Sequence, residues 1–226
     1  MKYFLRMGIM FDVKSIYATM SREYEYLQKE LFKSMLEKGL VYRDNRVVFW
    51  SAEEKRILDL EDLEQKSELN DCIVVKFPLT SFHGDSKFLE EEYIKQGKAL
   101  NFLGFLTEPW KYVGIRALTI HPEHNYCVVK IKEEYFICAY KRLPELSKRL
   151  NEKSPQILHM ARGSAFSNIL AEDPLFKRTL PVIINKESSE YYGTGINIIC
   201  PAHDMVSEKL VRNYNLPLEG FVNEEN

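Results

Sequence analysis

The chain has 226 residues, enough for one large domain or two small ones. Its 31 basic and 33 acidic side chains give a formal net charge of −2, so no global field attracts nucleic acid and any contact with it must be local. No apolar run reaches the roughly 18 residues of a membrane-spanning helix. Residues 1–10 lack a signal-peptide cleavage site, and the abrupt end at 222–226 leads us to expect an excised piece of a larger protein.

The first 70 residues are expected to hold one helix and one hairpin. An irregular segment, 2–18, comes first. Ser21 suits the N-cap of a helix whose apolar residues recur at helical spacing up to Gly39, a residue type that commonly ends helices. Residues 40–50 predict a β-hairpin with its turn at 44–45. The charged segment 53–67 predicts a solvated connection.

Strands dominate the pattern beyond residue 71. Apolar or alternating segments predict strands at 72–79, 100–106, 116–120, 126–131, 134–139, 180–185 and 196–200. Helices are expected at 88–97, 144–151 and 207–215, while 156–170 fits neither pattern clearly. Many short strands with few helices predict a mainly β fold with peripheral helices (α+β), built as a closed or nearly closed barrel. We therefore expect a connecting arm at 1–70 and a barrel domain at 71–226.

The cysteines and histidines give no sign of a metal site. Of Cys72, Cys127, Cys138 and Cys200, no two form a C-x-x-C pair, and three lie in apolar runs, which predicts free thiols in a reducing compartment without disulfides or zinc. Cys200 is interpreted as buried and inert rather than nucleophilic. His121 and His124 flank two residues in a turn, where no third ligand is evident, so we interpret them as a polar hairpin turn.

Two segments place reactive side chains just beyond predicted strands. Gly193 and Gly195 precede the apolar run 196–200, whose one polar break is Asn197, and Pro201 ends that run before His203 and Asp204. The second segment is 106–110, with a threonine and a glutamate. Together they could bind a small amine-bearing ligand, with an acid for the ammonium group, Thr for steric rejection or water positioning and backbone groups for an ester carbonyl.

Several blocks resemble the editing domain (connective peptide 1) of class I aminoacyl-tRNA synthetases of the isoleucine, valine and leucine group. Residues 38–43 with 47–51 are similar to the family's KGLVYR…PVYWS, and 73–79 to IYVKFPL. Residues 107–110 through 120–123 are similar to WTTTPWTLPAN…AVHPE, and 193–203 to GTGLVHTAPGH. The blocks keep their order across nearly the whole chain. Trp110 favours the isoleucyl branch, in its mitochondrial or bacterial-like form, whereas 201–204 leans towards the valyl and leucyl pattern.

The resemblance implies a β-barrel that hydrolyses wrongly attached amino acids from tRNA, with a helix-hairpin arm leading to a catalytic core. It assigns the editing pocket to Thr107, Glu108, Trp110, Lys111, Thr194, Ile198, His203, Asp204 and Ser207, with no metal and no defined catalytic residue. It implies the aminoacylated 3′ end of tRNA and the catalytic core of the same synthetase as partners, a monomer away from membranes, and a place in the mitochondrial matrix or, alternatively, the cytoplasm. This fragment would need no cofactor, while the parent ligase would use ATP and Mg²⁺.

The pocket residues depart from the family pattern. Only Thr107 keeps a hydroxyl of the threonine run, because Glu108 and Lys111 replace small residues with bulk and charge. Ungapped alignment places Ile198 at the family histidine and Ser207 at the aspartate that anchors the substrate ammonium. A hydrogen bond to a charged group is worth roughly 1.5–3 kcal/mol, so its loss weakens substrate binding. Asp204 or Glu208 are the candidate substitutes.

We therefore expect an editing domain of an isoleucine-type ligase whose hydrolysis of Val-tRNA is weakened or lost, with a remaining structural role. Three alternatives stay open. The pocket is rearranged and active through Asp204, or the domain belongs to a valyl or leucyl enzyme. The third is a free-standing deacylase. The arm at 24–50 makes this alternative less favoured, because it resembles the linker to the catalytic core and a free protein would not need it.

Overall fold

The computed structural model describes residues 2–9, 12, 17–67 and 69–222. Its contacts divide the chain into two compact units, Met1–Asn45 and Arg46–Asn226, each of which is described here by itself. The predicted arm at 1–70 and barrel domain at 71–226 remain predictions of domain organisation. Among the helices in these ranges, none combines the length and apolar character needed to cross a bilayer.

The first unit contains α1 (Lys2–Arg6) and the longer α2 (Arg22–Glu37). The predicted cap at Ser21 is confirmed, because its Oγ accepts a hydrogen bond from the Tyr24 amide at 3.2 Å. Gly39 follows the helix with a φ of +67°, a conformation that glycine adopts without steric cost. The expectation of an irregular segment at 2–18 is wrong for residues 2–6, which are helical, and residues 10–11 and 13–16 lie outside the described part.

A hairpin is present, but it is not the predicted one. β1 (Phe49–Ser51) pairs with β2 (Arg56–Leu58), so the expected hairpin at 40–50 with its turn at 44–45 is wrong. The turn uses Ser51, whose Oγ accepts a hydrogen bond from the Glu54 amide at 3.1 Å, and Lys55, which adopts a φ of +51°. Neither the Ser51 hydrogen bond nor the positive φ of Lys55 is visible in the spacing of apolar residues. The apolar pattern therefore predicted a hairpin at the wrong position.

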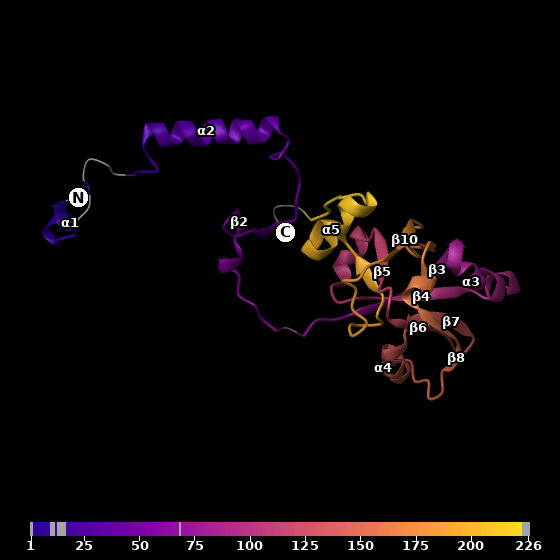
Figure 1. The fold of residues 1–226 in the computed structure, drawn as a ribbon. Helices are drawn as coiled ribbons and strands as arrows, with labels where there is room; N and C mark the ends of the chain where they lie inside the picture. The colour runs from indigo at the N-terminus through magenta and orange to yellow at the C-terminus, as the bar shows by residue number, and fades with distance from the viewer. Residues whose placement is uncertain (1, 10–11, 13–16, 68, 223–226) are drawn as a thin grey trace. The chain divides into compact units, whose positions relative to one another are not determined.

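The barrel consists of six of the described strands. They are β3 (Ile73–Phe82), β4 (Leu100–Leu106), β5 (Ala117–Ile120), β9 (Ile169–Glu172), β10 (Thr179–Ile184) and β11 (Asn197–Ile199). The sheet order β11-β5-β10-β9-β3-β4 closes on itself because β11 also pairs with β4, through Asn197 and Phe105. The predicted mainly β barrel is therefore confirmed, and Figure 1 shows its strands gathered beside α5.

Further elements extend and cover the barrel. β6 (Asn125–Ile131), β7 (Glu134–Ala139) and β8 (Gln156–Arg162) continue the sheet beyond β4, and the predicted meander of β6 and β7 is confirmed. The helices are α3 (Lys87–Glu92), α4 (Leu143–Arg149) and α5 (Met205–Tyr214). The 3-10 turns are η1 (Leu60–Asp62), η2 (Gly84–Ser86), η3 (Ile94–Gln96), η4 (Pro109–Gly114), η5 (Tyr140–Arg142), η6 (Gly163–Phe166) and η7 (Pro201–His203).

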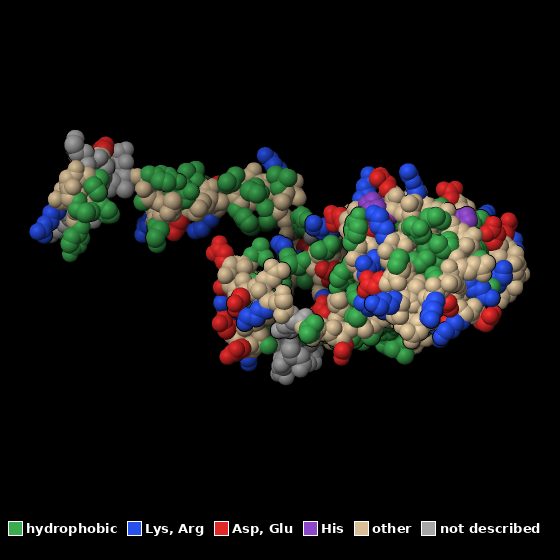
Figure 2. Space-filling view, turned by 90° about the horizontal axis from the view of Figure 1, so that it is seen from below, with side chains coloured by type: hydrophobic (Ala, Val, Ile, Leu, Met, Phe, Trp, Pro, Cys, Tyr) green, Lys and Arg blue, Asp and Glu red, His purple; other side chains and the backbone are tan. Residues whose placement is uncertain are grey.

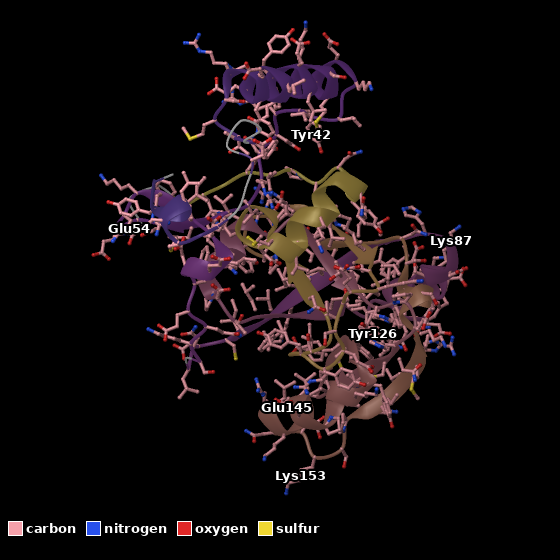
Figure 3. The ribbon with its side chains drawn as sticks, turned by 60° about the vertical axis from the view of Figure 1, so that its left-hand side comes forward. Tyr42, Glu54, Lys87, Tyr126, Glu145 and Lys153 are labelled. Atoms are coloured by element: carbon pink, nitrogen blue, oxygen red, sulfur yellow. The ribbon has the colours of Figure 1, made fainter. Side chains whose placement is uncertain are left out.

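Aromatic and branched side chains fill the barrel. Phe77, Phe102, Leu118 and Tyr126 are fully buried in one cluster. Tyr126 lies among the strands, whereas Lys87 and Glu145 point away from them (Figure 3). Burial raises the pKa of Tyr126 to about 12, so its hydroxyl keeps its proton and donates a hydrogen bond to the Gly195 carbonyl at 3.0 Å.

A second, smaller cluster holds α5 against the outside of the barrel. Ala117 of β5, Ile183 of β10 and Ile199 of β11 pack with Leu210 of α5. The polar beginning of α5 consequently lies near the ends of β4 and β11, where the predicted pocket residues are found.

Candidate functional site

A cavity of about 330 Å³ lies where β4 ends, β11 passes and α5 begins. Six of the nine predicted pocket residues line it, namely Thr107, Glu108, Lys111, Ile198, Asp204 and Ser207. The two strand-end segments of the sequence therefore do meet at one site. A third wall comes from the loop after β10.

The β4 side of the cavity carries an internal ion pair. Two residues separate Pro109, which begins η4, from the end of β4, and this turn brings the Lys111 ammonium onto the Glu108 carboxylate. The Lys111 Nζ also lies 5.4 Å from the centre of the Trp110 ring. These two charges compensate each other, so the side chains that were expected to disturb an apolar pocket form a paired group along its edge.

The α5 side is organised by Asp204, which caps the helix. One carboxylate oxygen accepts from the Val206 amide at 3.1 Å, and the other accepts from the Ser207 amide at 3.2 Å and from the Ser207 hydroxyl. Backbone amides at a helix N-terminus favour a negative charge there. Asp204 thus lines the cavity, but much of its hydrogen-bonding capacity is used by the helix. Glu208, the other candidate anchor, accepts from the Val47 amide at 3.2 Å.

Thr194 does not line the cavity, and its hydrogen bonds instead connect neighbouring strands of the sheet. It is buried, and its hydroxyl donates to the Leu103 carbonyl. Its own carbonyl accepts from the Ala139 amide at 2.9 Å. The segment 193–195 is therefore fixed onto β4 and β7, and the Tyr126 hydroxyl of β6 holds the Gly195 carbonyl.

Trp110 and His203 lie together at a neighbouring cavity of about 440 Å³, which Val47 and Phe49 also line. Their ring centres are 5.5 Å apart, and the His203 Nε2 accepts from the Phe221 amide at 3.3 Å. Burial and the nearby Lys111 ammonium lower the pKa of His203, which favours the neutral ring that this hydrogen bond requires.

Ile198 supplies no acid or base, but its neighbour Asn197 brings a polar side chain to the cavity. The Asn197 Oδ1 is buried with no hydrogen-bond partner among the described residues, and so is the Ser188 Oγ. Both residues line the cavity. The sequence marked Asn197 only as the polar break in an apolar run, and Ser188 lies in a turn with no such signal.

Of the remaining titratable candidates, Cys200 also lines the cavity, whereas His121, His124, Cys127 and Cys138 lie outside it. The rings of His121 and His124 stack with centres 3.7 Å apart in the predicted turn, and the described residues contain no cluster suited to a metal ion. Cys200 is buried, and burial raises the pKa of its thiol to about 11, so it stays protonated at neutral pH. Cys127 and Cys138 face each other across β6 and β7 as free thiols, 3.9 Å apart.

The fold is that of an editing domain. The structure of GlLeuRS-CP1 superposes with a TM-score of 0.54 at 15% identity, covering 63% of this chain and 59% of that one. The editing domain of the P. knowlesi cytosolic leucyl-tRNA synthetase gives a TM-score of 0.52 at 14% identity, covering 64% and 62%. These likenesses are of fold alone.

Residues 1–179 match the family described as tRNA synthetases class I (I, L, M and V), and the chain belongs to this family. It is 26% identical to the isoleucine–tRNA ligase of Mycoplasmoides gallisepticum over 98% of its own length and 24% of the relative's. Against the isoleucine–tRNA ligase of Acaryochloris marina it is 29% identical over 96% of its length and 22% of the relative's. The chain thus spans about a quarter of these relatives.

Proposed function

We propose that the chain is the editing domain of an isoleucine–tRNA ligase, and that the cavity at β4, β11 and α5 receives the aminoacyl end of a tRNA. The observation that carries this is the meeting of Thr107 and Asp204 at one cavity on an editing-domain barrel. The similarity to isoleucine–tRNA ligases over nearly the whole chain favours the isoleucyl branch over the valyl and leucyl ones.

Such a domain supplies discrimination that binding cannot. An apolar pocket separates valine from isoleucine by only about 1–3 kcal/mol, because the two differ by a single methylene group. Hydrolysis of Val-tRNA(Ile) in a second, smaller cavity removes the errors. The parent enzyme joins isoleucine to tRNA(Ile) with ATP and Mg²⁺, while this part of it needs no cofactor of its own.

We further propose that hydrolysis here is weak. Ile198 offers no proton acceptor, the Asp204 carboxylate is committed to the start of α5, and Lys111 is held by Glu108. An attacking water molecule needs a base within hydrogen-bond reach, and none of these three side chains is available to act as that base. The domain then acts mainly by holding the acceptor end of the tRNA next to the catalytic core of the same synthetase, as a monomer away from membranes.

The test measures release of valine from Val-tRNA(Ile) by the 226-residue chain, with acceptor-end binding followed in parallel. We expect measurable binding and a release rate close to that in buffer alone. Ile-tRNA(Ile) and Val-tRNA(Val) serve as controls for the amino acid and the tRNA. Absence of any tRNA binding would contradict the proposed function itself.

An active, rearranged pocket is the alternative, and the presence of Asp204 in the cavity favours it. Asp204→Asn separates the two, because asparagine caps a helix about as well as aspartate but carries no charge. If Asp204 anchors the substrate ammonium, valine release is fast and falls about tenfold or more in this variant. If hydrolysis is weak, wild type and variant release valine equally slowly.

The compartment follows from the parent enzyme. The relatives described above are bacterial, which fits either a mitochondrial matrix enzyme of bacterial type or a bacterial cytoplasmic one. We propose the mitochondrial matrix, and localisation of the full-length protein by fractionation tests it.

A further inference from the structure

The cavity at β4, β11 and α5 contains two polar groups that nothing in the described structure satisfies. The Asn197 Oδ1 and the Ser188 Oγ are each buried and without a hydrogen-bond partner among the described residues. Ser188 retains only 6% of its exposure. A buried polar atom left unpaired costs about 1–3 kcal/mol, so such atoms usually face water or a ligand.

The charge around these atoms favours a cationic ligand. Three carboxylates line the cavity, from Glu108, Glu187 and Asp204, against the single ammonium of Lys111. Lys111 is neutralised by Glu108, so the uncompensated charge is that of Glu187 and Asp204. An amide oxygen only accepts hydrogen bonds, and a hydroxyl accepts as well as donates. A group with several N–H donors and a positive charge therefore matches this wall.

We propose that Asn197 and Ser188 form the ammonium-binding subsite of this cavity, in place of a carboxylate at the start of α5. The inference rests on the proposed function, because the primary ammonium in question is the α-amino group of the bound aminoacyl ester. Asn197 on β11 is a positioning residue: it holds the amine so that the ester lies towards Thr107. Asp204 contributes its field while remaining the cap of α5.

This subsite also explains how the domain can bind its ligand without the usual anchor at position 207. Ser207 donates its hydroxyl to Asp204, and Glu208 accepts from the Val47 amide and does not line this cavity, so neither supplies a free carboxylate at this wall. Asn197 and Ser188 come from a barrel strand and from the loop after β10. The ammonium is thus received on the barrel side of the cavity rather than at the helix.

The experiment uses two pairs of probes with the full 226-residue chain. L-Valinamide and 3-methylbutanamide differ only in the amine. The second pair carries the same two acyl groups, L-valyl and 3-methylbutanoyl, on the 2′-amino group of 2′-amino-2′-deoxyadenosine. The amide bond in this pair cannot be hydrolysed as an ester. For wild type we expect the amine-bearing member of each pair to bind about tenfold or more tightly than its partner.

Single-residue variants then identify the side chains that cause the preference for the amine-bearing probe. Asn197→Leu, similar in shape and apolar, should reduce affinity for L-valinamide about tenfold and leave 3-methylbutanamide unchanged. Ser188→Ala should act in the same direction, and Asn197→Asp should bind the amine more tightly than wild type. Asn101→Leu is the matched control, since Asn101 is likewise an asparagine on a barrel strand, β4, and is itself buried, but lies outside the cavity. Thermal unfolding of each variant verifies its fold.

The outcomes separate the inference from the proposed function. Amine preference that depends on Asn197, without any gain from the nucleoside, supports the subsite and contradicts the tRNA assignment. Conjugates that bind without a preference for the amine support the proposed function and overturn the subsite. In that case the Asn197 Oδ1 and the Ser188 Oγ are hydrogen-bonded to water. Equal losses for both members of a pair in Asn197→Leu, or binding of neither pair by wild type, also overturn it.

Discussion

Gly195 combines two constraints that no other residue satisfies. Its φ is +77°, and a Cβ at this position would lie 2.2 Å from the Cβ of the buried Ala139 at the end of β7. Its carbonyl also accepts the Tyr126 hydroxyl. The glycine therefore permits the close approach of segment 193–195 to β7, on which the position of β11 depends.

Gly195→Ala should consequently destabilise the chain by about 2–4 kcal/mol, through backbone strain and overpacking together. Urea unfolding followed by tryptophan fluorescence measures this loss. Gly220→Ala is the control, because nothing lies within 4 Å of its added Cβ and its φ is not in the left-handed region. Losses of similar size in both variants would show that packing at Ala139 is not the cause.

At the scale of elements, the connection between β9 and β10 depends on one buried carboxylate. Asp173 is fully buried and accepts hydrogen bonds from the Tyr112 hydroxyl at 2.6 Å, from Arg178 and from the Leu175 amide at 3.0 Å. Burial by itself would raise the pKa of Asp173, but these hydrogen bonds outweigh it and lower the pKa below its ordinary value. The ionised carboxylate thus stabilises the folded hairpin.

Acid should weaken this hairpin in a defined direction. Because the folded-state pKa of Asp173 is depressed, its contribution is complete above the unfolded value of about 3.9 and declines as the pH falls through that value towards the folded pKa. Asp173→Asn should cost about 3 kcal/mol at pH 7, since Arg178 loses its buried partner. The difference in unfolding free energy between wild type and variant should shrink towards pH 3. A constant difference across this range would show that charge is not the origin.

The elements also show what a sequence pattern can determine. α2 was predictable because its apolar spacing, its cap at Ser21 and the glycine after it are all local signals. The β1–β2 hairpin was not, since its turn depends on a side-chain hydrogen bond and on a lysine with positive φ. The pocket segments were identified by their residue types, whereas Asn197 was seen only as an irregularity. Its importance depends on which neighbours share its cavity.

At the scale of the molecule, barrel closure depends on pairings between strands far apart in the sequence. β5 and β10 pair in parallel, as do β4 and β11, and no local periodicity specifies such partners. The sequence indicated a barrel through the number of its strands, and the resemblance implied the same β-barrel, but neither specified which strands pair. The cavity exists only because closure brings Thr107 of the β4 end to Asn197 of β11.

Charge is the other property of the whole molecule that bears on the proposed binding of tRNA. The formal net charge is −2, and Figure 2 shows basic and acidic side chains interspersed over the face that it presents. Proteins that neutralise many phosphates lose affinity steeply with salt, because each contact releases a condensed counterion. This chain lacks the overall charge for such contacts. The proposed affinity for a tRNA end should instead arise from the terminal nucleotide and the amino acid in the cavity.

We therefore predict that binding of an aminoacylated acceptor-stem minihelix depends only weakly on salt. A plot of log Kd against log salt concentration should have a slope of less than about 3. Fluorescence anisotropy between low and physiological salt measures it. The matched control is the same minihelix without its amino acid, which should bind more weakly with the same slope, because the cavity contacts involve no additional phosphate. A slope of about 6 or more would instead demonstrate a phosphate-binding surface, and would place most of the recognition outside the cavity.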